Sequence, residues 1–507
     1  GRRGQALRLL WAGLVSLLCA AAEEGVRPSC RKSPELHSLV PESSSPDGLV
    51  HEDIIAFGGK GFSWVEGSRA EELASEEGSQ LLFDGEGNTG EDEDDDDDDL
   101  VEDDDDDDLV DMEDPAAEFT VGEDPAGLVS ITRRRRKVTK QVGFFGDTWK
   151  FSLQSHSWLR VDVGSESPTH RWKPSSTEFE DNRAIAMFGG CTSTKMEGVL
   201  NDLWVFRLRQ STPALGTWTR VDTINPPLAR RGHIAVANQS HLVVLGGKGL
   251  TLQRTGKGRH KTKKMKSTVL VDLWSLPLAA LAAGAEQGVA SWAPGASFPG
   301  PPRWGATGTL IADGSREVLA LFGGRNKNPG FAEHEQSAAA YTYYNELWLY
   351  DFAMDSWELA PAAAVGDGLP RPRDHHGACF VGGRLFIFGG RASEVAVASS
   401  VLNDLWSYSL SEGRWSRHHA GAKPAPIPRF MPGITGVQPG NRIFPHGAVV
   451  VFAGEHLPGT TKRTSLNGVW AYDLANGRWD DLSSSDCSPG ATGVLGASEA
   501  PSGGLAG

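Results

Sequence analysis

Cysteine is scarce in this chain, with five residues among 507. A scaffold built from disulfides would need many more, so a hydrophobic core has to carry the fold. Long hydrophobic runs are also lacking. The longest uncharged apolar run, residues 9–22, is shorter than the roughly 20 residues that cross a bilayer as a helix. We therefore expect no membrane span in the mature protein.

Glycine and proline are frequent, with 61 and 29 residues, but glycine has no three-residue period, which excludes a collagen-like fibre. The composition instead predicts many tight turns and disfavours a helical bundle. The formal net charge is −17, but residues 91–114 hold 19 aspartates and glutamates, and without these 19 charges it is +2. The acidity therefore belongs to one segment and not to the folded part of the chain.

The first residues resemble a secretory signal. Arg2 and Arg3 precede the apolar residues 9–22, and the small residues that end this run fit a signal-peptidase site before Glu23. We expect residues 1–22 to be a signal peptide, and the protein to be secreted or to lie in an endomembrane lumen, with the cytoplasm as the alternative. A glycosylation sequon beginning at Asn238 is consistent with secretion.

An internal repeat dominates the rest of the chain. A short apolar run ends in two glycines in five copies, and a sixth, degenerate copy ends in Ala453 and Gly454. The five diglycines are Gly58 and Gly59, Gly189 and Gly190, Gly246 and Gly247, Gly323 and Gly324, and Gly389 and Gly390. A first tryptophan follows at Trp149, Trp204, Trp274, Trp348, Trp406 and Trp470, and a second at Trp158, Trp218, Trp292, Trp357, Trp415 and Trp479.

The repeated residues have a structural explanation. Two glycines after a β-rich run let the backbone leave a strand with positive φ at low steric cost. Tryptophan buries a large face between neighbouring sheets. An Asn or Asp ahead of each Leu-Trp pair is expected to close an Asx turn. Arginine-containing segments, such as that beginning at Arg373, open most later copies and add a fourth strand to each.

The pattern resembles the kelch repeat, in which an aromatic residue and a tryptophan separated by six residues follow the diglycine, as Tyr350 and Trp357 do here. The resemblance covers about residues 51–482 and implies an all-β fold, a β-propeller with four-stranded blades. Six copies predict six blades, with seven left open. We expect a signal peptide (1–22), a lead-in (23–50), the propeller (51–482) and a Gly/Ala/Ser-rich tail (483–507).

Closure of the ring needs a strand that the first copy lacks. Residues 490–495 of the tail echo residues 305–310 and are the candidate donor of this strand. Cys30 and Cys487 flank the repeats and form a candidate disulfide that would join the two ends.

The long insertions lie between the second and third strands of their blades, at residues 60–146, 248–269, 325–344 and 391–401. In a four-stranded blade these loops emerge on the same face as the connections between blades, which predicts a working face. The acidic tract within residues 60–146 is expected to be disordered, because its self-repulsion is not offset by burial. Weak binding of Ca²⁺, or binding to a basic partner, are the functional alternatives to a solvated charge run.

A basic run lies in the third copy. It contains Arg254, Lys257, Arg259, Lys261, Lys263, Lys264 and Lys266. Nucleic-acid binding is not expected, because no aromatic residues alternate with these cations. A solvated loop and docking of this loop against the acidic insertion remain as alternatives.

Basic residues recur at two positions of the repeat. Lys60, Lys248, Arg325 and Arg391 follow diglycines, and Arg231, Arg303, Arg373 and Arg429 open the later copies. Together they are predicted to surround the mouth of the central channel and to attract acidic peptides or acidic glycans. The alternative is that they only form salt bridges and hydrogen bonds at strand ends.

Signatures of catalysis are missing from the sequence. The kelch family includes galactose oxidase, whose copper site requires two histidines, two tyrosines and a Tyr-Cys cross-link, but three of the six tyrosines here occupy repeat positions and the others share one loop. His375 and His376 are adjacent in a strand pattern, point to opposite faces and so cannot chelate together. We expect no metal site, no cofactor and no enzyme activity.

The sequence therefore predicts a non-catalytic propeller of the secretory pathway that binds a protein or an acidic glycan on its insertion face. An intracellular scaffold for cytoskeletal or ubiquitin-related complexes is the alternative, and a carbohydrate-active enzyme is the less favoured one.

Overall fold

The structure is a computed structural model. It describes residues 31–32, 34–39, 53–66, 118–123, 129–134, 138–180, 183–193, 196–209, 215–255, 262–281, 290–312, 314, 316–331, 337–361, 363–364, 368–393, 400–418, 424–457 and 463–483. Four predicted features lie outside these residues: the signal peptide, the acidic tract, the Cys30–Cys487 disulfide and the candidate tail strand.

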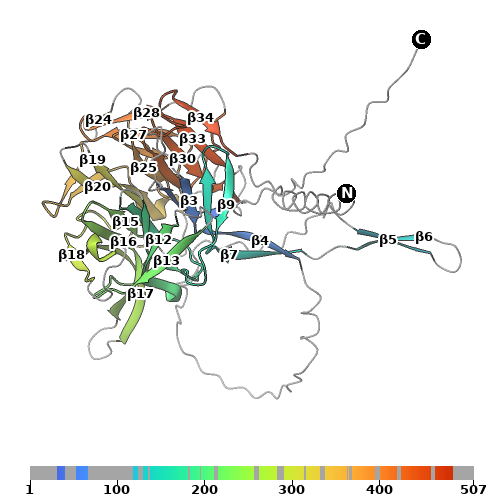
Figure 1. The fold of residues 1–507 in the computed structure, drawn as a ribbon. Helices are drawn as coiled ribbons and strands as arrows, with labels where there is room; N and C mark the ends of the chain where they lie inside the picture. The colour runs from blue at the N-terminus through green and yellow to red at the C-terminus, as the bar shows by residue number, and fades with distance from the viewer. Residues whose placement is uncertain are drawn as a thin grey trace, which may run out of the picture.

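Six antiparallel sheets, each with four strands in sequence order from the innermost to the outermost, make up most of the described chain (Figure 1). Blade 1 comprises β2 (Glu35–Leu39), β3 (Asp53–Phe57), β8 (Thr148–Ser152) and β9 (Ser157–Val161). Blade 2 comprises β10 (Ser175–Phe179), β11 (Ala184–Cys191), β12 (Val199–Leu208) and β13 (Gly216–Val221). Blade 3 comprises β15 (Ile234–Ala237), β16 (His241–Thr255), β17 (Thr262–Pro277) and β18 (Ala293–Gly295).

Blade 4 comprises β19 (Trp304–Ala312), β20 (Glu317–Lys327), β22 (Leu347–Asp351) and β23 (Ser356–Leu359). Blade 5 comprises β25 (Gly377–Val381), β26 (Arg384–Phe388), β27 (Leu405–Ser409) and β28 (Arg414–His418). Blade 6 comprises β29 (Gly433–Val437), β30 (Ala448–Phe452), β33 (Val469–Asp473) and β34 (Arg478–Asp481). The innermost strands lie side by side in the order β2, β10, β15, β19, β25, β29, and β29 contacts β2. The fold is a closed six-bladed β-propeller, as predicted.

Short elements complete the description. Blades 3, 4 and 5 each gain one short strand, which is β14 (Arg230–Arg231), β21 (Tyr341–Tyr343) and β24 (Ala363–Ala364), respectively. One small separate sheet consists of β1 (Arg31–Lys32), β4 (Lys60–Glu66) and β7 (Val138–Phe144). Two further pairs are β5 (Glu118–Glu123) with β6 (Val129–Arg134), and β31 (Glu455–His456) with β32 (Thr464–Ser465). The helices of the described residues are three 3₁₀ turns, η1 (Met196–Gly198), η2 (Leu278–Leu281) and η3 (Ala338–Ala340). None of the helices described is long and apolar enough to span a membrane.

The strand that completes blade 1 corrects the sequence prediction. β2 pairs with β3 in register from Glu35 opposite Phe57 to Leu39 opposite Asp53, so residues of the predicted lead-in supply the innermost strand. Sequence inspection missed β2 because it lacks the arginine-glycine-histidine pattern of the other copies. The propeller therefore begins before residue 51, and blade 1 needs no strand from the tail.

Aromatic contacts join neighbouring blades. In five blades the second tryptophan of the repeat packs on the phenylalanine that ends the apolar run of the preceding blade, with ring centroids 4.8–5.4 Å apart. The pairs are Trp158 with Phe452, Trp218 with Phe57, Trp292 with Phe188, Trp415 with Phe322 and Trp479 with Phe388. The Trp158–Phe452 pair belongs to a buried cluster shared by blades 1 and 6. The ring thus closes with the same contact that joins its other blades.

The diglycines adopt the predicted backbone conformation. Both residues have positive φ in all five, and Ala453 and Gly454 have φ of 61° and 99° in the sixth copy. A Cβ atom on Gly389 would lie 2.6 Å from the carbonyl oxygen of Arg429 in the next blade. Glycine is therefore required both for the left-handed backbone and for the close approach of the next blade.

Candidate functional site

Buried arginines hold together the connections on the insertion face. In blade 5, the Nη1 atom of Arg373 donates to the carbonyl oxygen of Gly389 (2.9 Å) and to Asp404 Oδ1 (2.7 Å), and Nη2 donates to Asp404 Oδ2 (2.8 Å). Arg171 and Arg230 make the same three bonds in blades 2 and 3. Arg303 bonds Gly323 and Glu346 in blade 4, and Arg429 bonds the carbonyl oxygen of Ala453 in blade 6. We call these five residues the staple arginines.

The carboxylates of this arrangement also bind tryptophan. The indole Nε1 atoms of Trp204, Trp274 and Trp406 donate to the aspartate two residues earlier at 2.6–2.7 Å. The predicted Asx turns are therefore wrong for these aspartates, which join an indole to a guanidinium instead. Asparagines directly precede Asp202, Glu346 and Asp404, and they donate to carbonyl oxygens of the following connection, as Asn345 does to Pro370 (3.0 Å). Burial opposes the charge of Asp404, but its bonds to Arg373 and that residue's charge outweigh burial and lower its pKa.

The predicted basic residues divide into two layers. Arg303, Arg373 and Arg429 are staple arginines, and their side chains are buried within the blades. Arg231 lies one residue beyond the staple position, which Arg230 occupies in blade 3. Lys60, Lys248, Arg325, Arg391 and Arg231 lie where the strands after the diglycines meet the chain arriving from the preceding blade. We call this end of the channel its mouth, and of the second layer Arg231 and Lys248 line the cavity that lies there.

Asp374 is the central anion of the mouth. Its carboxylate is 3.1 Å from Arg325 Nε, accepts a bond from Arg391 Nε (3.1 Å) and bonds His375 Nδ1 (2.8 Å). Burial disfavours its charge, but Arg391, His375 and Arg325 together lower its pKa. Burial lowers the pKa of His375 to about 3, so this ring is neutral at neutral pH. Because the Asp374 carboxylate can only accept a hydrogen bond, Nδ1 of the neutral His375 ring carries the proton and Nε2 is left as an acceptor.

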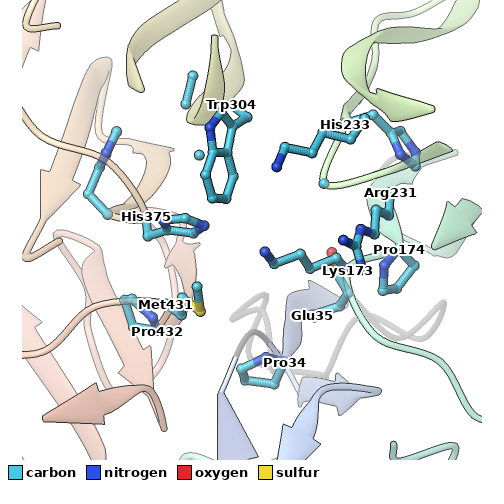
Figure 2. A pocket seen from close by; sticks show the side chains of 15 residues that line it. Pro34, Glu35, Lys173, Pro174, Arg231, His233, Trp304, His375, Met431 and Pro432 are labelled. Atoms are coloured by element: carbon cyan, nitrogen blue, oxygen red, sulfur yellow. The ribbon is translucent and has the colours of Figure 1, made fainter. Parts of the chain in front are cut away.

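A cavity of about 190 Å³ lies at this mouth between blades 2 to 6 and the start of β2. Figure 2 shows Lys173, Trp304 and His375 pointing into the same space. Lys248 Nζ lies 4.0 Å, and Arg325 Cζ 4.1 Å, from the centroid of the Trp304 ring. Lys173 Nζ lies 4.2 Å from the centroid of Trp172. The cavity wall therefore combines the cations Lys173, Arg231 and Lys248 with the indole ring of Trp304.

Of the residues that line this cavity, Arg231 and Lys248 were predicted as site residues from the sequence, whereas Lys173, Trp304 and His375 are among those that were not. Lys173 was missed because its copy reads Arg171-Trp172-Lys173-Pro174 and lacks the expected histidine. The spacing shared by Arg171-Trp172 and Arg303-Trp304 is the signal that would have found it. The prediction for His375 and His376 is corrected, because His375 has φ of 49°, β25 begins only at Gly377, and both rings line the cavity.

A second cavity of about 410 Å³ forms the channel behind the mouth. On its wall, His37 Nε2 bonds Ser176 Oγ (2.7 Å) and His37 Nδ1 lies 2.9 Å from Glu178 Oε1. Burial opposes the charge of His37, but Glu178 and Glu35 outweigh burial and raise its pKa. Ser176 Oγ donates to Glu35, so this group joins β2 to β10 across the boundary between blades 1 and 2. No group of three His, Cys, Asp or Glu side chains arranged to hold a metal ion occurs among the described residues.

Asn238 lies in the turn between β15 and β16, where its Oδ1 atom accepts bonds from the backbone nitrogens of Ser240 and His241. Gln239 and Ser240 are exposed. The sequon is therefore on the surface of the propeller.

Comparison with known proteins identifies the family. A family model described as the KLHDC2/KLHL20/DRC7 Kelch-repeats domain matches residues 137–283 and 290–498, more than half of the chain. The chain belongs to the kelch-repeat family. Kelch propellers commonly bind proteins.

Curated relatives extend this kelch assignment. Adagio-like proteins 3 and 1 of Oryza sativa subsp. japonica are 30% and 28% identical to the chain over 48% and 50% of its length, but over only 33% and 36% of their own. The flagellar outer arm dynein alpha chain of Chlamydomonas reinhardtii is 31% identical over 26% of this chain and 2% of its own length. The kelch chain thus spans about a third of the length of the Adagio-like proteins.

Replacing a staple arginine is expected to destabilise the propeller. Arg373→Met leaves the Asp404 carboxylate without its bidentate partner, and breaking a buried ion pair in this way costs about 3–5 kcal/mol of unfolding free energy. Urea denaturation measures the loss. The control is Arg414→Met, because Arg414 is 45% exposed and its pair with Glu412 contributes only about 0–1 kcal/mol. Equal losses in the two variants would contradict the role given to Arg373.

Stability is also expected to fall as the pH falls below about 6.5. Burial, and next the charge of Arg230, lower the pKa of His233 to about 3 from its ordinary value of 6.5. Between these pKa values His233 binds a proton in the unfolded chain but not in the folded chain. Its contribution to the free energy of unfolding is therefore fully present above pH 6.5 and is lost as the pH falls towards 3.

His233→Phe removes this group and should make the pH dependence shallower by up to one proton. Urea titrations at about pH 7.5 and pH 5 measure the slope. His446→Phe, at an exposed histidine, is the control for the replacement of a histidine by phenylalanine. An unchanged slope in His233→Phe would show that His233 is protonated in the folded protein.

Proposed function

We propose that this kelch propeller is a non-catalytic recognition domain that binds an acidic segment of a partner protein at the mouth of its channel. The observation that carries the proposal is the convergence of Lys173, Arg231 and Lys248 in one cavity, where both lysines lie over the ring of Trp304. Glu35 is the one carboxylate among the residues that line this cavity, and burial raises its pKa. The cavity is therefore positive and suits carboxylate side chains.

The other walls of the cavity suit a peptide. Met431, Pro432 and Trp304 offer apolar surface beside the cations. His375 Nε2 is an acceptor that faces the cavity and is suited to a backbone N–H group of the ligand. Association with such a mouth is expected to be steered by charge and to weaken with salt.

The choice of variants follows from the two layers of cations. Arg325 and Arg391 contact buried Asp374, so their replacement would disturb the fold as well as the mouth. Lys173 and Lys248 are half-buried and contact tryptophan rings, and they are the better test residues.

The double variant Lys173→Glu, Lys248→Glu is expected to weaken binding of a fluorescent deca-glutamate peptide at least about tenfold, because two attractive charges become repulsive. Fluorescence anisotropy at low and high salt measures the affinity. The control variant Arg160→Glu, Arg220→Glu makes the same change of net charge at exposed residues of outer strands and should bind nearly as the wild type does. If both double variants bind the peptide equally weakly, the loss of affinity would follow from net charge and not from the channel mouth. If binding of a heparin fragment depends on Lys173 and Lys248 and binding of the peptide does not, the result would favour an acidic glycan as the ligand.

We also propose that the protein works in the secretory pathway. The apolar residues 9–22 behind Arg2 and Arg3, and the surface position of the Asn238 sequon, support this location. When the full chain is expressed in animal cells, an N-glycosidase should reduce its mass by one glycan, and Asn238→Gln should abolish the reduction. An unmodified Asn238 in protein that retains residues 1–22 would favour the intracellular scaffold.

A further inference from the structure

The hairpin of β16 and β17 extends beyond its blade. The strands stay in register to the pair Thr255 and Thr262, whereas β14 and β18 pair only with residues nearer the blade, at 248–249 and 273–275. In the described part of the chain, residues 250–255 and 262–267 pair only with each other. Figure 1 shows the end of this hairpin projecting away from the ring near the label β17. The edges of the projecting hairpin therefore pair with no other strand of the described chain.

Two large apolar side chains are exposed side by side on the projecting hairpin. Leu252 and Met265 are direct partners in the ladder, so they share one face, and they are 58% and 50% exposed. Single exposed apolar residues are ordinary, but an adjacent pair on an otherwise polar projection suggests a contact surface.

The rest of the projecting hairpin carries only positive charge. Residues 248–271 contain no aspartate or glutamate. The register of the two strands places Arg254 opposite Lys263. Lys266 is exposed next to Met265. A ligand that matches this surface has to combine acidic residues with a few apolar ones.

The acidic insertion of the same chain has this composition. Residues 91–114 hold 19 acidic residues, and the apolar pairs at 100–101 and 109–110 each follow a run of six aspartates. The insertion leaves blade 1 after Glu66 and returns at Val138, which are paired at the end of β4 and β7. The 27 residues between Glu66 and Asp94 can span up to about 90 Å. The tether is long enough to reach another blade and raises the effective concentration of the tract.

We propose that residues 91–114 dock on the β16–β17 hairpin, with an apolar pair of the tract on Leu252 and Met265 and the flanking aspartates beside the lysines and Arg254. The hairpin is favoured over the channel mouth because the lysines of the mouth, Lys173 and Lys248, lie against tryptophan rings. This inference does not depend on the proposed function. It makes the acidic tract a ligand of its own propeller.

Zero-length carbodiimide cross-linking of the full chain at low salt tests the proposal. We expect intramolecular cross-links, found in the monomer fraction by peptide mapping, between the carboxylates of residues 91–114 and Lys263, Lys264 or Lys266. The double variant Leu252→Ser, Met265→Ser keeps every lysine and should reduce these cross-links at least about fivefold, because it removes the apolar contact. The control variant Met354→Ser, Leu359→Ser changes two residues of blade 4 that are 73% and 56% exposed, and should leave the cross-links unchanged.

Three results would overturn the proposal. Cross-links from the tract to Lys60, Lys173 or Lys248 in place of the hairpin would place it at the channel mouth. Cross-links confined to a dimer fraction would make a second copy the occupant. Hairpin cross-links that survive the Leu252 and Met265 substitutions would reduce the contact to nonspecific charge attraction.

Discussion

The architecture of the insertion face depends on one buried interaction, the bond network of the staple arginines. In blades 2 to 5 each guanidinium donates to the carbonyl oxygen of the first glycine of a diglycine, and it also binds a carboxylate within the third strand or directly before it. In blade 6, Arg429 donates to the carbonyl oxygen of Ala453. The main chain of the same residues reaches the preceding blade, where Gly324 and Gly390 donate to the carbonyl oxygens of Arg373 and Arg429. One residue type thus fixes the turn within a blade and the spacing between blades.

The channel mouth follows from this network. Because the staple arginine is fixed, the next residue is held at the rim, and it is tryptophan in blades 2 and 4, arginine in blade 3, aspartate in blade 5 and phenylalanine in blade 6. The fold therefore fixes the position of the rim side chain in each blade, whereas the residue type at that position differs between blades. The cavity beside Trp304 results from that choice, with Lys173 and Lys248 as its accessible cations.

The sequence predicted the six blades, the positive φ of the diglycines and the aromatic pairs, because these features repeat at fixed spacings. It failed where a copy departs from the pattern. β2 has no arginine-glycine-histidine signature, and Lys173 stands in a copy whose histidine is replaced by proline. It also assigned Arg303, Arg373 and Arg429 to the mouth, since spacing shows that a cation recurs and does not show that a diglycine carbonyl and an aspartate bury it.

The closure of the ring has a consequence for how the chain is ordered. Blades 1 and 6 are each built from their own consecutive strands, and Trp158 meets Phe452 as Trp218 meets Phe57. Among the residues that the structure describes, the boundary between the first and last blades is therefore made by the same Trp–Phe contact as four of the other boundaries. In this described part of the ring, closure and blade-to-blade packing are one and the same interaction, so a substitution of Phe452 would loosen the ring closure as a substitution of Phe57 would loosen the next boundary.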